Sequence, residues 1–193
     1  MATKFFKIVS LVIIVFSASS CFLTKGDEDC DEYGTEANVS GLIKITPLQE
    51  TYNVGDVITI TATLPSKNNY FATGQVDIHA ETNDDNGIFT LAMWQHEGSS
   101  FPGTSLYVDN VVEFIEGGIE NNTMGVFKMP YFAETDEYRI KYKVTLNRTG
   151  NYILIQDNSS NIYFQGGSTC NRYFINTDIE NNNSIEDITF TVQ

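Results

Sequence analysis

The stretch YRIKYKVTL, residues 138–146, has the pattern that decides the fold. Apolar or aromatic side chains occupy every second position, and basic residues or threonine stand between them. Successive side chains of a β-strand point to opposite faces of a sheet. The alternation therefore predicts a strand with one buried face and one face in water.

The same period of two recurs through most of the chain after residue 36. It predicts strands over residues 43–46, 58–64, 76–80, 88–94, 124–129, 138–146, 152–156, 172–175 and 188–192, with one or two more within 106–115. The run from Asn83 to Gly87 predicts a hairpin turn between the strands on either side of it. No amphipathic helix is predicted. Many short strands separated by turns are typical of an all-β sandwich or barrel.

Two motifs point to a family. The run from Tyr52 to Asp56 reads Tyr-x-Val-Gly-Asp, and Gly150-Asn151-Tyr152 opens a late strand. With these motifs the chain resembles immunoglobulin-like sandwich domains of bacterial surface proteins, in which the second motif is similar to the tyrosine-corner strand. The resemblance implies an antiparallel, immunoglobulin-like β-sandwich over residues 37–193. Because a simple domain of this kind has about 100 residues, it also implies extra strands or an insertion within 95–135.

The first 20 residues have the three parts of a secretory signal peptide. Lys4 and Lys7 precede an apolar run over residues 8–16, and small residues follow at 17–20. The apolar run is about half the roughly 18 residues that a bilayer-spanning helix needs. The segment therefore predicts export rather than a permanent transmembrane anchor.

Cys21 follows the small residues directly, and the segment resembles the signal of bacterial lipoproteins. The resemblance implies a signal peptide over residues 1–20, cleavage before Cys21, lipidation of its sulfur, and an acidic tether over 21–36. Ala18 stands where that family favours leucine. Cleavage by an ordinary signal peptidase, which would release a soluble protein, is the alternative.

The tether also resembles the export signal that sends some Gram-negative lipoproteins to the cell surface. Lys25 precedes a run of acidic residues, although Gly26 separates it from them. The resemblance implies a lipid-anchored protein of the outer membrane that faces outward. A periplasm-facing protein is the alternative.

Charge limits the partners. All 25 acidic residues follow Cys21, whereas two of the 11 basic residues precede it, so the segment from Cys21 onward keeps nine basic residues and a formal net charge of −16. Nucleic-acid binding needs cationic contacts to phosphates. The balance argues against nucleic acid and against anionic lipid surfaces as partners.

With Cys21 assigned to lipid, Cys30 and Cys170 are left as a pair. A disulfide between them is the expected state in an exported, oxidising compartment. Two free thiols are the alternative. No CxxC spacing or neighbouring histidine supports a metal site, and no cofactor is expected.

The sequence offers little catalytic chemistry. Its two histidines are His79 and His96, and no nucleophile elbow, HExxH motif or phosphate-binding glycine loop is present. The protein is therefore expected not to be an enzyme. A hydrolase would need one of these histidines beside carboxylates in a cleft. The acidic turn at residues 83–86 could offer oxygen ligands to calcium, but a plain hairpin turn is favoured.

The candidate binding surface consists of aromatic and basic side chains. Tyr-Phe occurs four times, at 70–71, 131–132, 163–164 and 173–174, and the favoured arrangement buries Phe and leaves Tyr on the wet face. The residues chosen for this surface are Trp94, Tyr131, Tyr163, Tyr173, Arg139, Lys141 and Lys143. The last three form a basic stripe, which is favoured as protection for an edge strand, with docking of the acidic tether or an acidic partner as the alternative.

The leading hypothesis is a non-catalytic interaction module, anchored by lipid at the outer membrane or cell surface, that acts as an accessory subunit or adhesin-like component with a protein partner. A glycan-binding lipoprotein of a nutrient-uptake system is the alternative, and a hydrolase is less favoured. The glycan alternative requires Trp94 or several tyrosines on one exposed patch.

Overall fold

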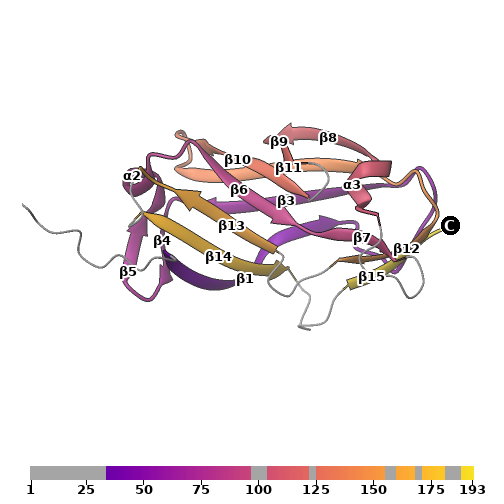
Figure 1. Ribbon diagram of the computed structural model, residues 1–193, viewed down its shortest axis with the longest axis horizontal. Helices are drawn as coiled ribbons and strands as arrows, with labels where there is room; N and C mark the ends of the chain where they lie inside the picture. Colours follow the sequence, from indigo (N-terminus) through magenta and orange to yellow (C-terminus); the bar gives the residue numbers. More distant parts are fainter. Residues whose placement is uncertain (1–33, 97–103, 122–124, 155–159, 168–170, 181–187) are drawn as a thin grey trace, which may run out of the picture. The chain divides into compact units, whose positions relative to one another are not determined.

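The computed structural model describes residues 34–96, 104–121, 125–154, 160–167, 171–180 and 188–193. The chain divides into two units, residues 1–32 and 33–193. All described residues belong to the second unit, in which strands dominate and two short helices are present (Figure 1).

The strands and helices have the following bounds, in chain order. They are β1 (Thr35–Thr46), β2 (Thr51–Tyr52), β3 (Val57–Pro65), β4 (Lys67–Phe71), β5 (Gly74–Asp77), α2 (Ile78–Thr82), β6 (Asn86–Leu91), β7 (Met93–His96), α3 (Leu106–Asp109), β8 (Val111–Glu116), β9 (Gly118–Asn121), β10 (Val126–Phe132), β11 (Glu137–Thr145), β12 (Gly150–Leu154), β13 (Ser160–Gln165), β14 (Arg172–Ile179) and β15 (Ile188–Val192).

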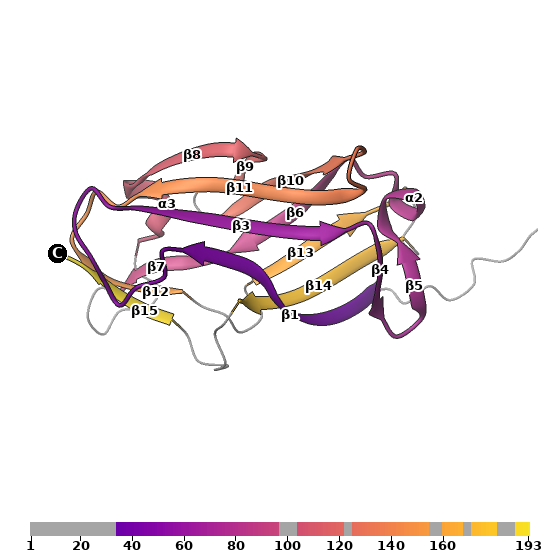
Figure 2. The same cartoon turned by 180° about the vertical axis from the view of Figure 1, so that it is seen from behind.

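Seven strands close into a ring. The largest sheet has the order β8-β11-β3-β1-β14-β13-β6-β10-β9, and β10 also pairs with β11 (Figure 2). The ring therefore runs from β11 through β3, β1, β14, β13, β6 and β10 back to β11. A ring of purely antiparallel neighbours needs an even number of strands. The parallel pairing of β1 with β14 is what allows seven to close.

A smaller sheet of order β2-β15-β12-β7 lies beside the ring. β6 and β7 are consecutive in the chain, with Ala92 between them, so the chain passes from one sheet to the other at this residue. Leu91 and Met93 are both buried. A third, two-stranded sheet consists of β4 and β5.

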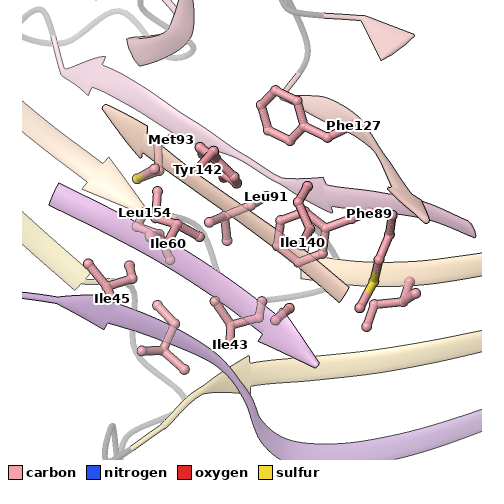
Figure 3. Packing of buried hydrophobic residues seen from close by; sticks show 14 of the residues in the cluster. Ile43, Ile45, Ile60, Phe89, Leu91, Met93, Phe127, Ile140, Tyr142 and Leu154 are labelled. Carbon is pink, nitrogen blue, oxygen red and sulfur yellow. The ribbon is translucent and has the colours of Figure 1, made fainter. Parts of the chain in front are cut away.

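The core follows from the alternation in β3 and β11. In the antiparallel register of these strands, Ile60 lies opposite Tyr142 and Ala62 opposite Ile140, and all four side chains are buried. Phe89, Leu91, Phe127 and Leu154 join the same cluster (Figure 3). Burial of apolar area is the main favourable term in folding. The period-two stretches therefore supply most of this cluster.

The predicted strands at 43–46, 58–64, 138–146 and 188–192 are confirmed within one or two residues, except that β1 begins at Thr35. The predicted strand at 88–94 is divided between β6 and β7. The predicted strand at 124–129 continues as β10 through Pro130 to Phe132. Strand β13 was not predicted.

The prediction for residues 76–80 is wrong. Only Gly74–Asp77 is strand, and Ile78–Thr82 is helix α2. Asp77 is the N-cap, and its side chain accepts a hydrogen bond from the backbone amide of Ala80. An aspartate at this position stabilises a helix start. The predicted hairpin is wrong as well, because β5 pairs with β4 whereas β6 pairs with β10 and β13.

Within 106–115 the chain first forms the short helix α3 and then the strand β8. The side chain of Ser105 caps α3 by accepting a hydrogen bond from the amide of Tyr107. Of the two alternatives for residues 95–135, extra strands or an insertion, the described residues show extra strands, β8 and β9, beside the ring strand β10.

One hydrogen bond of the kind expected for a tyrosine-corner strand is present. The hydroxyl of Tyr152 donates a hydrogen bond of 2.8 Å to the carbonyl oxygen of Arg148, four residues earlier. Because strands make up most of the described residues, the predicted all-β fold is confirmed. The strand order nevertheless departs from the expected immunoglobulin-like sandwich, because seven strands close into a ring instead of dividing between two open sheets.

Candidate interaction surface

The ring has one short seam, between β10 and β11. Their register contains only two pairs, Tyr131 with Tyr138 and Phe132 with Glu137. Farther from the turn that joins β10 to β11, β11 pairs with β8 and β10 pairs with β9. The two strands of the seam therefore diverge, and β8 and β9 line the two sides (Figures 1 and 2).

Gly117 makes the turn between β8 and β9. Its φ is +97°, and a Cβ atom there would lie 2.6 Å from the carbonyl oxygen of Lys128 and 3.0 Å from Cγ1 of Ile140. Lys128 belongs to β10 and Ile140 to β11. Gly117 therefore lies where these two strands diverge, at a place and in a conformation that suit glycine.

Apolar side chains are exposed along this edge. Val111 and Ile115 on β8 are 59% and 49% exposed, Ile119 on β9 is 51% exposed, and Val108 on α3 is 51% exposed. They are four of the seven exposed large apolar side chains among the described residues. Single exposed apolar residues are normal, whereas a contiguous exposed apolar patch of several hundred Å² marks an interaction site. We call these four residues the apolar edge.

The inward side of β8 is only partly covered. Val112 and Phe114 are partly buried and pack against the core cluster. The ring of Phe114 lies 5.5 Å from that of Phe127 and 5.4 Å from that of Tyr142, measured between centroids. The aromatic core thus extends to the outermost strand of the sheet.

Two buried tyrosines meet beneath this edge. The hydroxyls of Tyr107 and Tyr142 lie 3.2 Å apart. Burial raises the pKa of both phenols, so both stay protonated. The pair links α3 to β11 through a hydrogen bond inside the core.

The basic stripe does not lie on an edge strand, so that expectation is wrong. β11 is paired with β3 along its whole length on one side, and with β10 and then β8 on the other. Lys143 lies opposite Glu113, and Lys141 lies opposite Glu116. Charges that face each other in this way stabilise strand pairing. The stripe therefore stabilises the pairing of β8, which is one of the two end strands of this sheet.

Arg139, the third member of the stripe, lies farther along β11. Its Nη2 is 3.8 Å from Oε1 of Glu116, and its guanidinium carbon lies 4.0 Å from the centroid of the Phe132 ring. Among the described residues its Nε has no hydrogen-bond partner. Arg139 is thus engaged by its neighbours and covers an aromatic ring.

The four Tyr-Phe pairs do not share one arrangement. Phe71 and Phe164 are buried beside partly exposed tyrosines, as favoured from the sequence, but Tyr173 is buried and Phe174 is partly exposed. Tyr131 and Phe132 are both partly exposed. The position of each residue in its strand, and not its polarity, decides which ring is buried.

The predicted aromatic surface is therefore scattered. Tyr173 is 5% exposed and donates a hydrogen bond to Glu81, so it cannot belong to an exposed platform. Tyr163 on β13 stacks on Phe174 of β14 with 4.6 Å between centroids. Trp94 is partly exposed on β7, in the smaller sheet. Tyr163 therefore contacts Phe174, which was not among the predicted surface residues, and it belongs to a different sheet from Trp94.

Tyr131 belongs to a polar cluster around α2. Its ring stacks on that of His79, with 3.7 Å between centroids and 9° between planes. Nε2 of His79 lies 3.1 Å from Oδ1 of Asp85, and the hydroxyl of Tyr131 donates a 2.7 Å bond to Asp136. That bond raises the pKa of Tyr131 to about 12. The cluster ties α2 to the β10–β11 hairpin.

The acidic turn is occupied by its own hydrogen bonds. Asp84 accepts bonds from the backbone amides of Asn86 and Gln165, at 3.0 and 3.2 Å. Within the described ranges, no group of three or more His, Cys, Asp and Glu side chains is placed to hold a metal ion. The turn therefore serves to connect α2 with β6 and β13.

Several predicted residues cannot be placed. Cys21, Cys30 and Cys170 lie outside the described residues, as does the side chain of His96. In the part of the chain that is described, no helix has the length and apolar character needed to cross a bilayer.

The apolar edge was missed from the sequence. Residues 111–116 read Val-Val-Glu-Phe-Ile-Glu, in which alternation would place Val111 and Glu113 on one face and Val112 and Phe114 on the other. That signal was present. What the sequence did not reveal is that this strand lies at the end of its sheet.

Comparison with known proteins gives little. No protein-family model and no curated protein matches the chain. The crystal structure of the human F-spondin reeler domain (fragment 1) is 13% identical with a TM-score of 0.40, covering 87% of this chain and 100% of that one. A conjugative transposon lipoprotein from Bacteroides eggerthii is 13% identical with a TM-score of 0.23, covering 77% of this chain and 96% of that one. Neither likeness is close enough to carry an argument about function.

Proposed function

We propose that the chain is a non-catalytic, lipid-anchored interaction module of the outer membrane or cell surface, and that a protein partner binds at the apolar edge. The observation that carries the proposal is the exposure of Val108, Val111, Ile115 and Ile119 on the consecutive elements α3, β8 and β9. Exposing such side chains to water is unfavourable. Contact with a partner would remove them from water.

The localisation and the lipid anchor are part of the same proposal. The lipoprotein-like signal predicts that Cys21 carries the anchor and that residues 21–36 act as a tether. The predicted disulfide between Cys30 and Cys170 would join the tether to the domain. The tyrosine corner at Tyr152 supports a relationship with immunoglobulin-like domains, although the ring closure differs from their two-sheet plan.

The test is purification of the tagged full-length chain from its own membranes in mild detergent, with mass spectrometry of the proteins that accompany it. The proposal expects one protein in stoichiometric amount. Ile115→Asp places a charge in the apolar edge and should abolish its recovery. Leu48→Asp is the matched control, because Leu48 is also exposed, at 43%, but lies outside the edge.

Two results would overturn the proposal. One is a chain that purifies alone; the other is a partner that accompanies both variants equally. The anchor is tested separately by Cys21→Ser, which should move the chain from the membrane fraction to the soluble fraction. A variant that stays in the membrane fraction contradicts lipidation at Cys21.

Glycan binding is the second candidate, and one observation favours it. Tyr163 and Phe174 form a stacked, partly exposed pair on the outer side of β13 and β14. Aromatic faces of this kind can stack on sugars. Screening the full-length chain against glycans, with Tyr163→Ala as the variant, tests it. Binding that the variant abolishes supports this function, and no binding rejects it.

A further inference from the structure

We infer that the outer edge of β8 accepts an extended strand of the partner protein, and that this strand alternates apolar residues with lysine or arginine. The inference rests on the proposed interaction function and specifies its chemistry. Partner recognition of this kind adds a strand to an existing sheet through main-chain hydrogen bonds.

The first support is the backbone of β8. Among the described residues, β8 ends its sheet, and no strand pairs with its outer side. Natural edge strands are protected from unwanted pairing by charged side chains, lysine above all, by proline, by a bulge or by very short length. β8 has six residues, Val111–Glu116, and its charged side chains are Glu113 and Glu116, which oppose an acidic strand but not a basic one. Its irregularity falls late, between the positions opposite Tyr142 and Lys141. Most of the edge is thus left open to pairing.

The second support is the inward face. Val112 and Phe114 are partly exposed although they pack on the core. An added strand would place a side chain opposite each of them on the same face, since residues that face each other across a ladder lie on the same side. Apolar residues at these positions would complete their burial. This sets every second residue of the partner as apolar.

The third support is the outward face. In the register with β11, Glu113 lies opposite Lys143 and Glu116 lies opposite Lys141. On the other edge of β8, away from β11, no strand of the described chain supplies a basic neighbour to these two glutamates. A partner strand with lysine or arginine there would extend each row of alternating charge. This sets the partner residues that face Glu113 and Glu116 as basic.

A second copy of the chain fits this edge poorly. Two β8 strands paired antiparallel about Glu113 would place the two Glu113 carboxylates opposite each other, and like charges in that position destabilise the pair. The chain also carries a formal net charge of −14, which opposes association of two copies. A basic strand from a different protein has neither disadvantage.

The experiment uses the detergent-solubilised full-length chain and three labelled synthetic peptides. In the first, valine alternates with lysine; in the second, valine alternates with glutamate; the third is the first with a central proline, which removes a main-chain donor. Binding is measured by fluorescence anisotropy, and backbone protection by hydrogen exchange. We expect the lysine peptide alone to bind and to protect the amides of β8.

Two variants sharpen the result. Glu113→Gln should weaken binding of the lysine peptide by about fivefold, the upper range for one cross-strand charge pair. Glu50→Gln is the matched control, because Glu50 is exposed in the loop before β2, and it should leave binding unchanged. Equal affinity for the three peptides, protection away from β8, or insensitivity to Glu113→Gln would overturn the inference.

The outcomes separate this inference from the proposed function. If a partner accompanies the chain and Ile115→Asp abolishes it, but the lysine peptide does not bind, the interaction module stands and strand addition fails. If the lysine peptide binds and no partner accompanies the chain, the edge accepts strands and the proposed function fails. Dimers of the wild-type chain that dissociate in Ile115→Asp would show that a second copy occupies the edge, which overturns the inference.

Discussion

Lys143 on β11 lies directly opposite Glu113 on β8 in the antiparallel register of the two strands. Lys141 takes the equivalent position opposite Glu116. Opposite charges in such positions contribute roughly 0.2–1 kcal/mol to strand pairing. The basic stripe therefore stabilises the strand that carries the apolar edge, and this relationship can be tested by exchanging the charges.

Lys143→Glu should lower the free energy of unfolding by about 1 kcal/mol, because two carboxylates would then face each other. Hydrogen exchange should accelerate at the amides of β8 more than elsewhere. The double variant Lys143→Glu with Glu113→Lys restores opposite charges and should recover most of the loss. A double variant no more stable than the sum of the single changes contradicts the pairing.

Gly117→Ala should destabilise the protein by about 1–3 kcal/mol, the usual cost of a strained backbone conformation for a residue with a side chain. The positive φ and the nearby carbonyl oxygen of Lys128 both oppose a Cβ atom. Gly118→Ala is the control, because nothing lies within 4 Å of its added Cβ. Urea denaturation measures both. Equal losses for the two glycines would contradict the role given to Gly117.

Tyr152→Phe should cost about 1 kcal/mol, the usual net contribution of one hydrogen bond. The ring would keep its stacking on Phe190, at 5.2 Å between centroids, and lose the bond from its hydroxyl to Arg148. Tyr163→Phe is the control, because its hydroxyl donates a hydrogen bond to the exposed side chain of Gln165. Its effect should stay within about 0.5 kcal/mol. Thermal unfolding distinguishes the two.

Stability should also fall in strong alkali, in part through Tyr131. The hydrogen bond to Asp136, with lost hydration, raises the pKa of Tyr131 from 10.0 to about 12. A folded-state pKa above the unfolded value gives a contribution that is complete below pH 10 and disappears as the pH rises toward about 12. Tyr131→Phe should reduce this loss.

The measurement is urea denaturation of wild type and variant at a series of alkaline pH values. Burial raises the pKa of several other tyrosines, so only the difference between the proteins tests the contact; they are Tyr52, Tyr107, Tyr138, Tyr142 and Tyr173. Asp136→Asn keeps Tyr131 and removes the carboxylate, and it should reduce the loss in the same way. Identical pH dependence in all three proteins would exclude the contact as a cause.

Local patterns were read correctly where one face of a strand is buried and the other is wet. Residues 58–64 and 138–146 alternate without interruption, and both form strands because burial of one face needs only that alternation. The tyrosine corner could also be predicted, since the hydroxyl of Tyr152 bonds an atom only four residues away. Local spacing was sufficient in each of these cases.

Other features depended on competition between local preferences. Residues 76–80 have the alternation of a strand, but the carboxylate of Asp77 caps a helical turn and ends β5 at that residue. Polarity predicts that Phe174 is buried and Tyr173 exposed, but Tyr173 is buried and Phe174 is partly exposed. Their strand pairs with β1 and β13, which fixes Tyr173 on the inner face, where Glu81 accepts a hydrogen bond from its hydroxyl.

The sequence by itself determined that this protein is built from short strands, where most of them lie, and that one hydrogen bond closes the corner before β12. Only the tertiary structure decided the ring closure and the identity of the edge. Thr35 pairs with Tyr173, and Lys143 pairs with Glu113. Each pairing joins residues far apart in the chain, so no local period encodes which strand receives a neighbour on both sides and which is left open. That choice depends on how all the strands pack around one core, and it made β8, not the basic strand β11, the exposed edge.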